Sequence, residues 1–222
     1  QVANIRRDLG LDQPLLSQLF HWYANLFRGD LGRSLLLGQP VVEATMQRLP
    51  VTVALSAYAL VITLVIGLAT GIIAALRQNT WIDQVAMVLA MIGISLPNFY
   101  LGLLMIILFA VELRWLPTGG YIAFTDDPLG WLATSTMPAI SLALLLAGLL
   151  ARITRSTMLE VLRQDYIRTA RAKGLPYRKV VVKHALANAM IPITTVIGII
   201  VSLMISGSVV TETLFSIPGI GQ

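Results

Sequence analysis

The chain contains four long runs of mainly hydrophobic residues without any Asp, Glu, Lys or Arg. These runs cover residues 51–76, 85–111, 131–151 and 189–211. Each is long enough for a helix rising about 1.5 Å per residue to cross ~30 Å of hydrocarbon. Lipid offers no hydrogen-bond partners to a backbone, so the runs should be helices, and the alternation typical of membrane β-strands is missing. The pattern predicts an all-α polytopic membrane protein.

The segment between the third and fourth runs, residues 152–188, has a different pattern. Apolar or small residues recur every four positions at Met158, Leu162, Tyr166 and Ala170, while charged residues occupy the other faces. This spacing predicts one amphipathic helix that projects from the membrane-embedded part of the chain.

This amphipathic helix is expected to end at Gly174. Arg171 and Lys173 fall in its last turn, where the helix dipole favours cations. Gly174 can adopt the left-handed conformation of a C-terminal cap, and Pro176 prevents continuation. A second, basic helix should begin near Tyr177 and run into the last hydrophobic run. The sequence therefore predicts a helix–turn–helix.

The distribution of Lys and Arg predicts the orientation in the membrane. Residues 152–188 contain nine Lys and Arg against two acidic residues, whereas residues 112–130 contain one Arg against three. Positively charged loops remain in the cytoplasm. The predicted cytoplasmic segments are 77–84 and 152–188, and the predicted extracytoplasmic segments are 1–50, 112–130 and 212–222.

Small residues and prolines mark positions inside the runs where helices could approach closely or bend. Repeats of small residues every four positions favour helix packing in lipid, and proline removes a helical hydrogen bond. The candidate packing residues are Gly67, Gly71, Gly198, Ser202 and Ser206, and the candidate kinks are Pro97, Pro138 and Pro192. Close packing within the chain itself would explain the small-residue stripes equally well.

Composition narrows the functional classes further. Hydrophobic residues make up 56% of the chain and charged residues 12%, with a net charge of +5. Such a chain cannot cover itself with polar groups, which excludes a soluble enzyme or a nucleic-acid-binding protein. There is no cysteine, and the two histidines are far apart, so no metal site is expected. No Gly-Lys pair of a phosphate-binding loop is present, so this chain should not hydrolyse ATP.

The projecting helix–turn–helix has two explanations. Its nine cations could simply be attracted to anionic lipid. Its regular apolar ridge and the small residues before the turn instead suit insertion into a groove on a partner protein. We favour protein docking, because attraction to lipid requires no such register.

Several segments together resemble the permease subunits of ABC transporters, and most closely those of the dipeptide and oligopeptide importers, whose relatives include nickel permeases. The central segment is DYIRTARAKGL at residues 165–175, followed by HALANA at 184–189 and Pro192, which resembles the cytoplasmic EAA loop. The further matching segments are RLPVT at 48–52, LP at 96–97 with GLL at 102–104, LP at 116–117 with GG at 119–120, RSTMLE at 155–160 and ETLFSIPGIG at 212–221.

The loop departs from the general motif of this family at two places. Arg168, Thr169 and Ala170 occupy the positions of Glu-Ala-Ala, so that only the last alanine and Gly174 are kept. The segment HALA at 184–187 stands where the general pattern ends in Ile-x-Leu-Pro, and Pro192 comes later. Both departures are usual in the peptide-importer branch.

The resemblance implies a type I importer permease with about six transmembrane helices, of which four are present here. One further helix is then expected before Gln1 and another after Gln222. The implied partners are a second homologous permease, two cytoplasmic ATPase subunits that use ATP and Mg²⁺, and an extracytoplasmic substrate-binding protein. No cofactor is expected on this chain. The residues expected to dock on an ATPase are Asp165, Tyr166, Arg168, Thr169, Ala170, Arg171, Ala172, Lys173 and Gly174.

The function expected from the resemblance is ATP-driven import of dipeptides or oligopeptides through the bacterial or archaeal cytoplasmic membrane. Nickel or another small solute is an alternative cargo. An ion-coupled carrier or channel is an alternative of another class, although no ionisable side chain lies in the middle of a predicted span, where such carriers usually need one. A non-transporting membrane scaffold is the third alternative. The sequence alone assigns no role to Glu212, which lies at the outer edge of the last predicted span.

Overall fold

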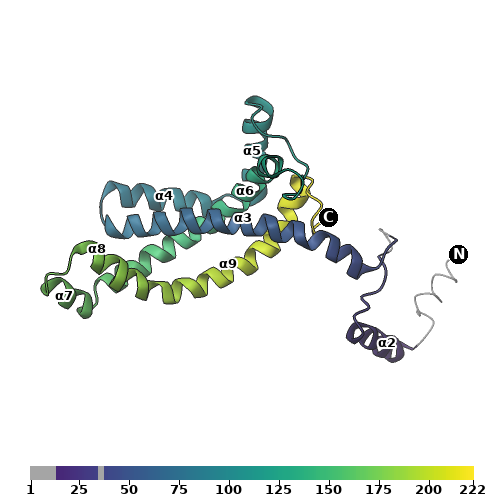
Figure 1. Ribbon diagram of the computed structural model, residues 1–222, viewed down its shortest axis with the longest axis horizontal. Helices are drawn as coiled ribbons and strands as arrows, with labels where there is room; N and C mark the ends of the chain where they lie inside the picture. Colours follow the sequence, from purple (N-terminus) through teal and green to yellow (C-terminus); the bar gives the residue numbers. More distant parts are fainter. Residues whose placement is uncertain (1–13, 35–37) are drawn as a thin grey trace. The chain divides into compact units, whose positions relative to one another are not determined.

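The computed structural model describes residues 14–34 and 38–222, and within these residues the fold is all-α, as predicted (Figure 1). The chain divides into two compact units, Gln1–Pro50 and Val51–Gln222. In the first unit, α2 (Leu15–Phe27) is followed by a backbone hydrogen bond in which the Val41 N–H donates to the Gly32 carbonyl at 2.9 Å. Residues 1–13 and 35–37 of the segment predicted to be extracytoplasmic lie outside the described residues.

Three long apolar helices in the described part of the chain could cross a membrane, or four if a bent pair counts as one span. They are α3 (Val41–Leu76), α6 (Pro128–Leu162) and a continuous helix over Tyr177–Leu214. The last comprises α8 (Tyr177–Lys179), the π-helical segment η2 (Val180–Leu186) and α9 (Ala187–Leu214). All three extend beyond the predicted hydrophobic runs, because their polar ends continue the same helices.

The span predicted over residues 85–111 is not one straight helix. It is made of α4 (Trp81–Ser95), α5 (Asn98–Met105) and the π-helical segment η1 (Ile106–Glu112), with a bend of 100° between α4 and the part that follows. Leu96 is extended, with ψ 125°, and Pro97 precedes the first residue of α5. A residue before proline is disfavoured in the helical conformation, which explains why the break falls at this candidate kink. Pro138 and Pro192 lie inside α6 and α9, which continue past them.

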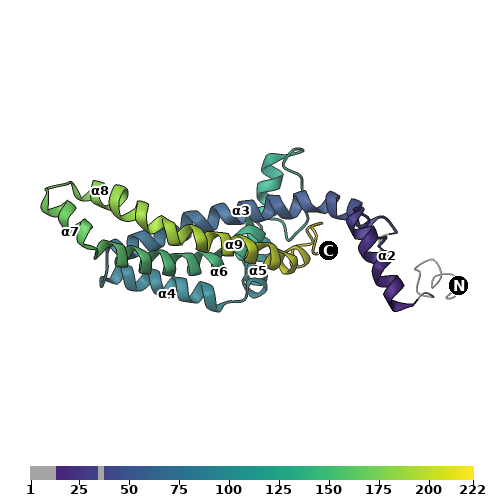
Figure 2. The same cartoon turned by 90° about the horizontal axis from the view of Figure 1, so that it is seen from below.

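Helix α6 occupies the centre of the second unit, packed against α4, α5 and α9 (Figure 2). It also contacts α3 through the first small-residue stripe: a Cβ atom at Gly71 would lie 2.6 Å from the Ala151 carbonyl oxygen, and one at Gly67 would lie 2.9 Å from the Leu150 Cβ. The stripe of Gly198, Ser202 and Ser206 differs. Ser202 and Ser206 are exposed, and a Cβ at Gly198 would meet no atom within 4 Å.

Both views place α7 (Asp165–Ala172) and α8 at the end of the second unit that lies opposite the C-terminus (Figures 1 and 2). The helix–turn–helix predicted from the sequence therefore projects from one end of the helical bundle. The assignment of that end to the cytoplasm stays a prediction from the distribution of basic residues.

Candidate functional site

The projecting segment begins at a break that the sequence analysis did not predict. The single amphipathic helix expected across Met158, Leu162, Tyr166 and Ala170 is two helices: α6 ends at Leu162, and α7 begins at Asp165. Gln164 between them is extended, with ψ 149°. The break rotates the register, so the prediction of one continuous apolar ridge was wrong.

Because of this break, two neighbouring side chains of α7 differ in burial from what the sequence predicted. Tyr166, predicted to lie on the apolar ridge, is 44% exposed, whereas Ile167 is completely buried. Ile167 and Ala170 join a core cluster with Val180, Val181 and Ala185 of η2. Helix α7 is therefore packed on the start of the long C-terminal helix.

The turn after α7 has the geometry predicted for Gly174. Its φ of +74° lies in the left-handed region, and its N–H donates to the Arg171 carbonyl at 2.9 Å. The Leu175 N–H donates to the Ala170 carbonyl at 3.3 Å, which completes a Schellman motif. These bonds satisfy carbonyl groups that the end of the helix would otherwise leave unpaired.

Of the residues expected to dock on an ATPase, one is buried and the others are exposed. Ala170 faces the core, so it supports α7 rather than presenting a surface. The exposed residues are Asp165, Tyr166, Arg168, Thr169, Arg171, Ala172, Lys173 and Gly174. This face carries more basic than acidic side chains, which suits an acidic or hydrogen-bond-accepting partner surface.

The polar contacts on this face are weak and local. Arg168 lies 3.5 Å from Asp165, and both side chains are largely exposed. The Arg171 guanidinium stacks over the Tyr177 ring at 5.8 Å from its centroid, which connects the two arms of the turn. Exposed ion pairs contribute little to stability, so their side chains can exchange partners at low energetic cost.

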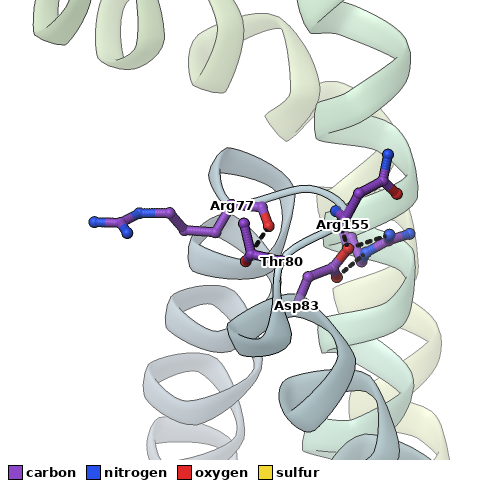
Figure 3. A network of polar contacts seen from close by, with 5 residues as sticks. Arg77, Thr80, Asp83 and Arg155 are labelled. Atoms are coloured by element: carbon purple, nitrogen blue, oxygen red, sulfur yellow. Dashed lines mark hydrogen bonds and ion pairs between the residues drawn. The ribbon is translucent and has the colours of Figure 1, made fainter.

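A partly buried ion pair lies near the projecting segment, and the sequence analysis did not identify it. Arg155 of α6 reaches across to Asp83 in the first turn of α4 (Figure 3). Its Nε donates to Asp83 Oδ1 at 2.5 Å and its terminal nitrogen donates to Oδ2 at 2.6 Å. Asp83 is only 3% exposed. Two parallel bonds of this kind fix orientation as well as distance.

The turn between α3 and α4 is tied to the same carboxylate. The Asn79 N–H donates to Asp83 Oδ2 at 3.0 Å, and Asn79 has a φ of 63°. Asparagine tolerates this left-handed conformation better than most residues. Thr80 Oγ1 donates to the Arg77 carbonyl at 2.5 Å, while the Arg77 side chain extends away from the pair (Figure 3). One carboxylate thus joins α4, α6 and the turn.

A second buried carboxylate, Glu212, lies near the end of α9. Its Oε1 accepts a hydrogen bond from Thr52 Oγ1 at 2.7 Å, and its Oε2 accepts one from the Gly221 N–H at 2.8 Å. The Ile220 N–H donates to Thr52 Oγ1 at 3.0 Å. A Cβ atom at Gly219 would overlap the Glu212 carboxylate, so only glycine allows this approach. Glu212 thus holds residues 216–221 against the bundle.

Motif segments far apart in the sequence meet near Glu212. The Gly120 N–H donates to the Phe215 carbonyl at 2.9 Å, and a Cβ at Gly102 would lie 2.6 Å from Leu214 Cδ2. Thr52 belongs to the RLPVT segment. Each of these segments was recognisable separately, but nothing in the sequence indicated which of them pair.

The fold and the projecting segment define a polytopic membrane protein with an exposed helix–turn–helix at one end of its bundle. Residues 67–222 match the family described as the binding-protein-dependent transport system inner membrane component. The chain belongs to this family. It is accordingly a multi-pass inner-membrane protein, and the resemblance stated from the sequence is confirmed.

Individual relatives cover the whole chain. A protein of Brucella suis biovar 1 (strain 1330), whose name describes a permease of a peptide transport system, is 51% identical over 221 residues, which are 100% of this chain and 70% of the relative. The glutathione transport system permease protein of Escherichia coli (strain K12) is 41% identical over 221 residues, with the same coverage of both chains. The chain is thus a permease of the peptide ABC importer family.

Proposed function

We propose that this chain is the permease subunit of an ATP-driven importer that moves dipeptides or oligopeptides across the cytoplasmic membrane. The observation that carries the proposal is the 51% identity, along the whole chain, to a relative named for a peptide transport system. The exposed helix–turn–helix of α7 and α8 supports it, because a permease without a phosphate-binding loop needs a surface that receives movement from an ATPase.

The proposed assembly contains this chain, a second homologous permease, two cytoplasmic ATPase subunits and an extracytoplasmic binding protein. ATP and Mg²⁺ would be bound by the ATPase subunits. The eight exposed residues of α7 and its turn would contact one ATPase, while buried Ile167 and Ala170 keep α7 attached to η2. The chain itself would perform no catalysis.

The mechanism follows from how α7 is attached. Closure of an ATPase dimer would displace α7, which is packed on η2. The helix over Tyr177–Leu214 is continuous, so a displacement at its start can move the whole helix as a rigid element. Such a movement would alternately open the two ends of the permease pair.

The decisive experiment is uptake into proteoliposomes that contain the complete complex with its binding protein, using a radiolabelled dipeptide. Uptake should require ATP inside the vesicles and persist when ion gradients are dissipated. Uptake that continues without ATP while an ion gradient is maintained would indicate an ion-coupled carrier. ATP-dependent uptake of Ni²⁺ but not of peptide would assign the alternative cargo, and the absence of any flux would favour a scaffold.

A further inference from the structure

The Asp83–Arg155 pair connects two helices at the end of the bundle that carries α7. Arg155 lies about two helical turns before the end of α6 at Leu162, and Asp83 lies in the first turn of α4. Only Arg163 and Gln164 separate α6 from α7, and their N–H groups donate to Glu160 and Val161 carbonyls at 3.3 Å and 3.1 Å. A displacement of α7 therefore acts on the end of α6 through a short, hydrogen-bonded link.

The pair is not the only close contact between α4 and α6 in the described part of the chain. Farther along the two helices the backbones already pack closely, because a Cβ atom at Gly148 would lie 2.5 Å from the Ala90 carbonyl oxygen. An ion pair adds something that this packing lacks: two parallel hydrogen bonds that fix the relative orientation of the helix ends. Asp83 is buried and the Arg155 side chain is 25% exposed, and such an ion pair often adds little net stability compared with apolar packing, which favours a directional role for this one.

The same carboxylate also holds the turn that leads from α3. The Asn79 N–H donates to Asp83, so one carboxylate contacts Arg155 of α6 and the turn at the end of α3 together. A mainly polar cleft lies between this turn and the residue before α7. It is lined by Gln78, Arg155, Ser156, Leu159, Glu160, Arg163 and Gln164.

We propose that Asp83 and Arg155 are positioning residues that form a rigid joint, through which displacement of α7 moves the α3–α4 pair as well as α9. This inference rests on the proposed function and deepens it. Without the joint, an ATPase could still bind and move α7, but less of that movement would reach α3 and α4. The affected quantity is then the number of peptides transported per ATP hydrolysed.

The test uses the complete complex in proteoliposomes, with a radiolabelled dipeptide and a measurement of phosphate release in the same sample. Asp83→Asn and Arg155→Gln remove one charge each, and Arg155→Lys keeps the charge but cannot form the two parallel bonds. Arg152→Gln is the matched control, because Arg152 is an exposed arginine on the same helix. The exchange of both residues, Asp83→Arg with Arg155→Asp, tests for rescue.

We expect Asp83→Asn, Arg155→Gln and Arg155→Lys to lower the ratio of transport to hydrolysis by roughly twofold to thirtyfold, the range typical of residues along a coupling route. The exchanged pair should recover part of the loss, and Arg152→Gln should keep the original ratio. Arg155→Lys retains the positive charge opposite Asp83, so it serves as the test if the other single variants fail to fold.

Two results would contradict the proposal that Asp83 and Arg155 form a joint. One is an unchanged ratio in folded Arg155→Lys or Asp83→Asn complexes. The other is a proportional loss of uptake and hydrolysis, since that would make the pair a purely structural contact. If the unmodified complex shows no ATP-dependent peptide uptake at all, the proposed function fails before the joint is tested, so the two failures are distinguishable.

Discussion

Thr52 and Glu212, 160 residues apart in the chain, form a buried hydrogen bond of 2.7 Å between the hydroxyl of α3 and the carboxylate of α9. Glu212 also accepts the Gly221 N–H, and Thr52 accepts the Ile220 N–H. The two side chains together hold the segment after α9 in place. Glu212, to which the sequence analysis gave no role, is therefore an anchor of the C-terminal motif.

Replacing Glu212 with alanine should destabilise the second unit. The change leaves Thr52 Oγ1 and the Gly221 N–H without their acceptor, and a buried unpaired polar group costs roughly 1–3 kcal/mol. Glu212→Gln keeps one carbonyl oxygen and should lose less. The unfolding temperature of the purified complex in detergent measures both variants. Equal unfolding temperatures for Glu212→Ala and the unmodified chain would contradict the anchoring role.

Position 174 should tolerate a larger side chain but not a β-branched one. Its φ is +74°, yet a Cβ atom there would meet no atom within 4 Å, so the restriction is the backbone conformation alone. This left-handed conformation costs an ordinary L-residue roughly 1–2 kcal/mol and costs asparagine less. We expect Gly174→Val to reduce ATP-dependent uptake much more than Gly174→Asn does. Membrane insertion should be unchanged in both, as measured by the amount of chain in purified membranes.

Tyr166 and Ile167 are neighbours with different expected effects. Ile167→Ala should destabilise α7 by roughly 2–5 kcal/mol, because Ile167 is completely buried. Tyr166→Ala removes an exposed side chain, so it should weaken co-purification of the ATPase without changing the unfolding temperature. The unfolding temperature, measured together with co-purification from native membranes and mass spectrometry, distinguishes the two. Loss of stability in Tyr166→Ala would show that Tyr166 belongs to the core instead.

The two small-residue stripes offer a matched comparison of helix packing. Gly71→Val should disrupt the contact between α3 and α6, because its first added carbon would lie 2.6 Å from Ala151 and Thr154 atoms. Overpacking of this kind typically costs roughly 1–3 kcal/mol. Gly198→Val is the matched change at a position where an added Cβ would meet no atom within 4 Å, so it should lower the unfolding temperature much less. Detergent-solubilised yield and thermal unfolding measure both, and a stable Gly71→Val variant would contradict the close packing.

The sequence predicted most of the helices but placed their ends less well. The basic helix predicted to begin near Tyr177 and run into the hydrophobic run at 189–211 is confirmed as one continuous helix over Tyr177–Leu214. The run at 51–76 identified α3, yet this helix already begins at Val41. The sequence indicated the break at Leu96 only as a candidate kink at Pro97. The break at Gln164 carried no proline or glycine signal, and it moved Tyr166 out of the core and Ile167 into it.

By itself, the sequence determined the properties that depend on neighbouring residues: the apolar lengths that require membrane helices, the left-handed stop at Gly174 and the basic character of the projecting segment. Only the tertiary structure decided that Arg155 meets Asp83 and that Thr52 meets Glu212. The rotation of each helix about its axis determines which side chains of distant segments face one another. In an apolar span nearly every face is hydrophobic, so periodicity leaves that rotation undefined until the helices pack.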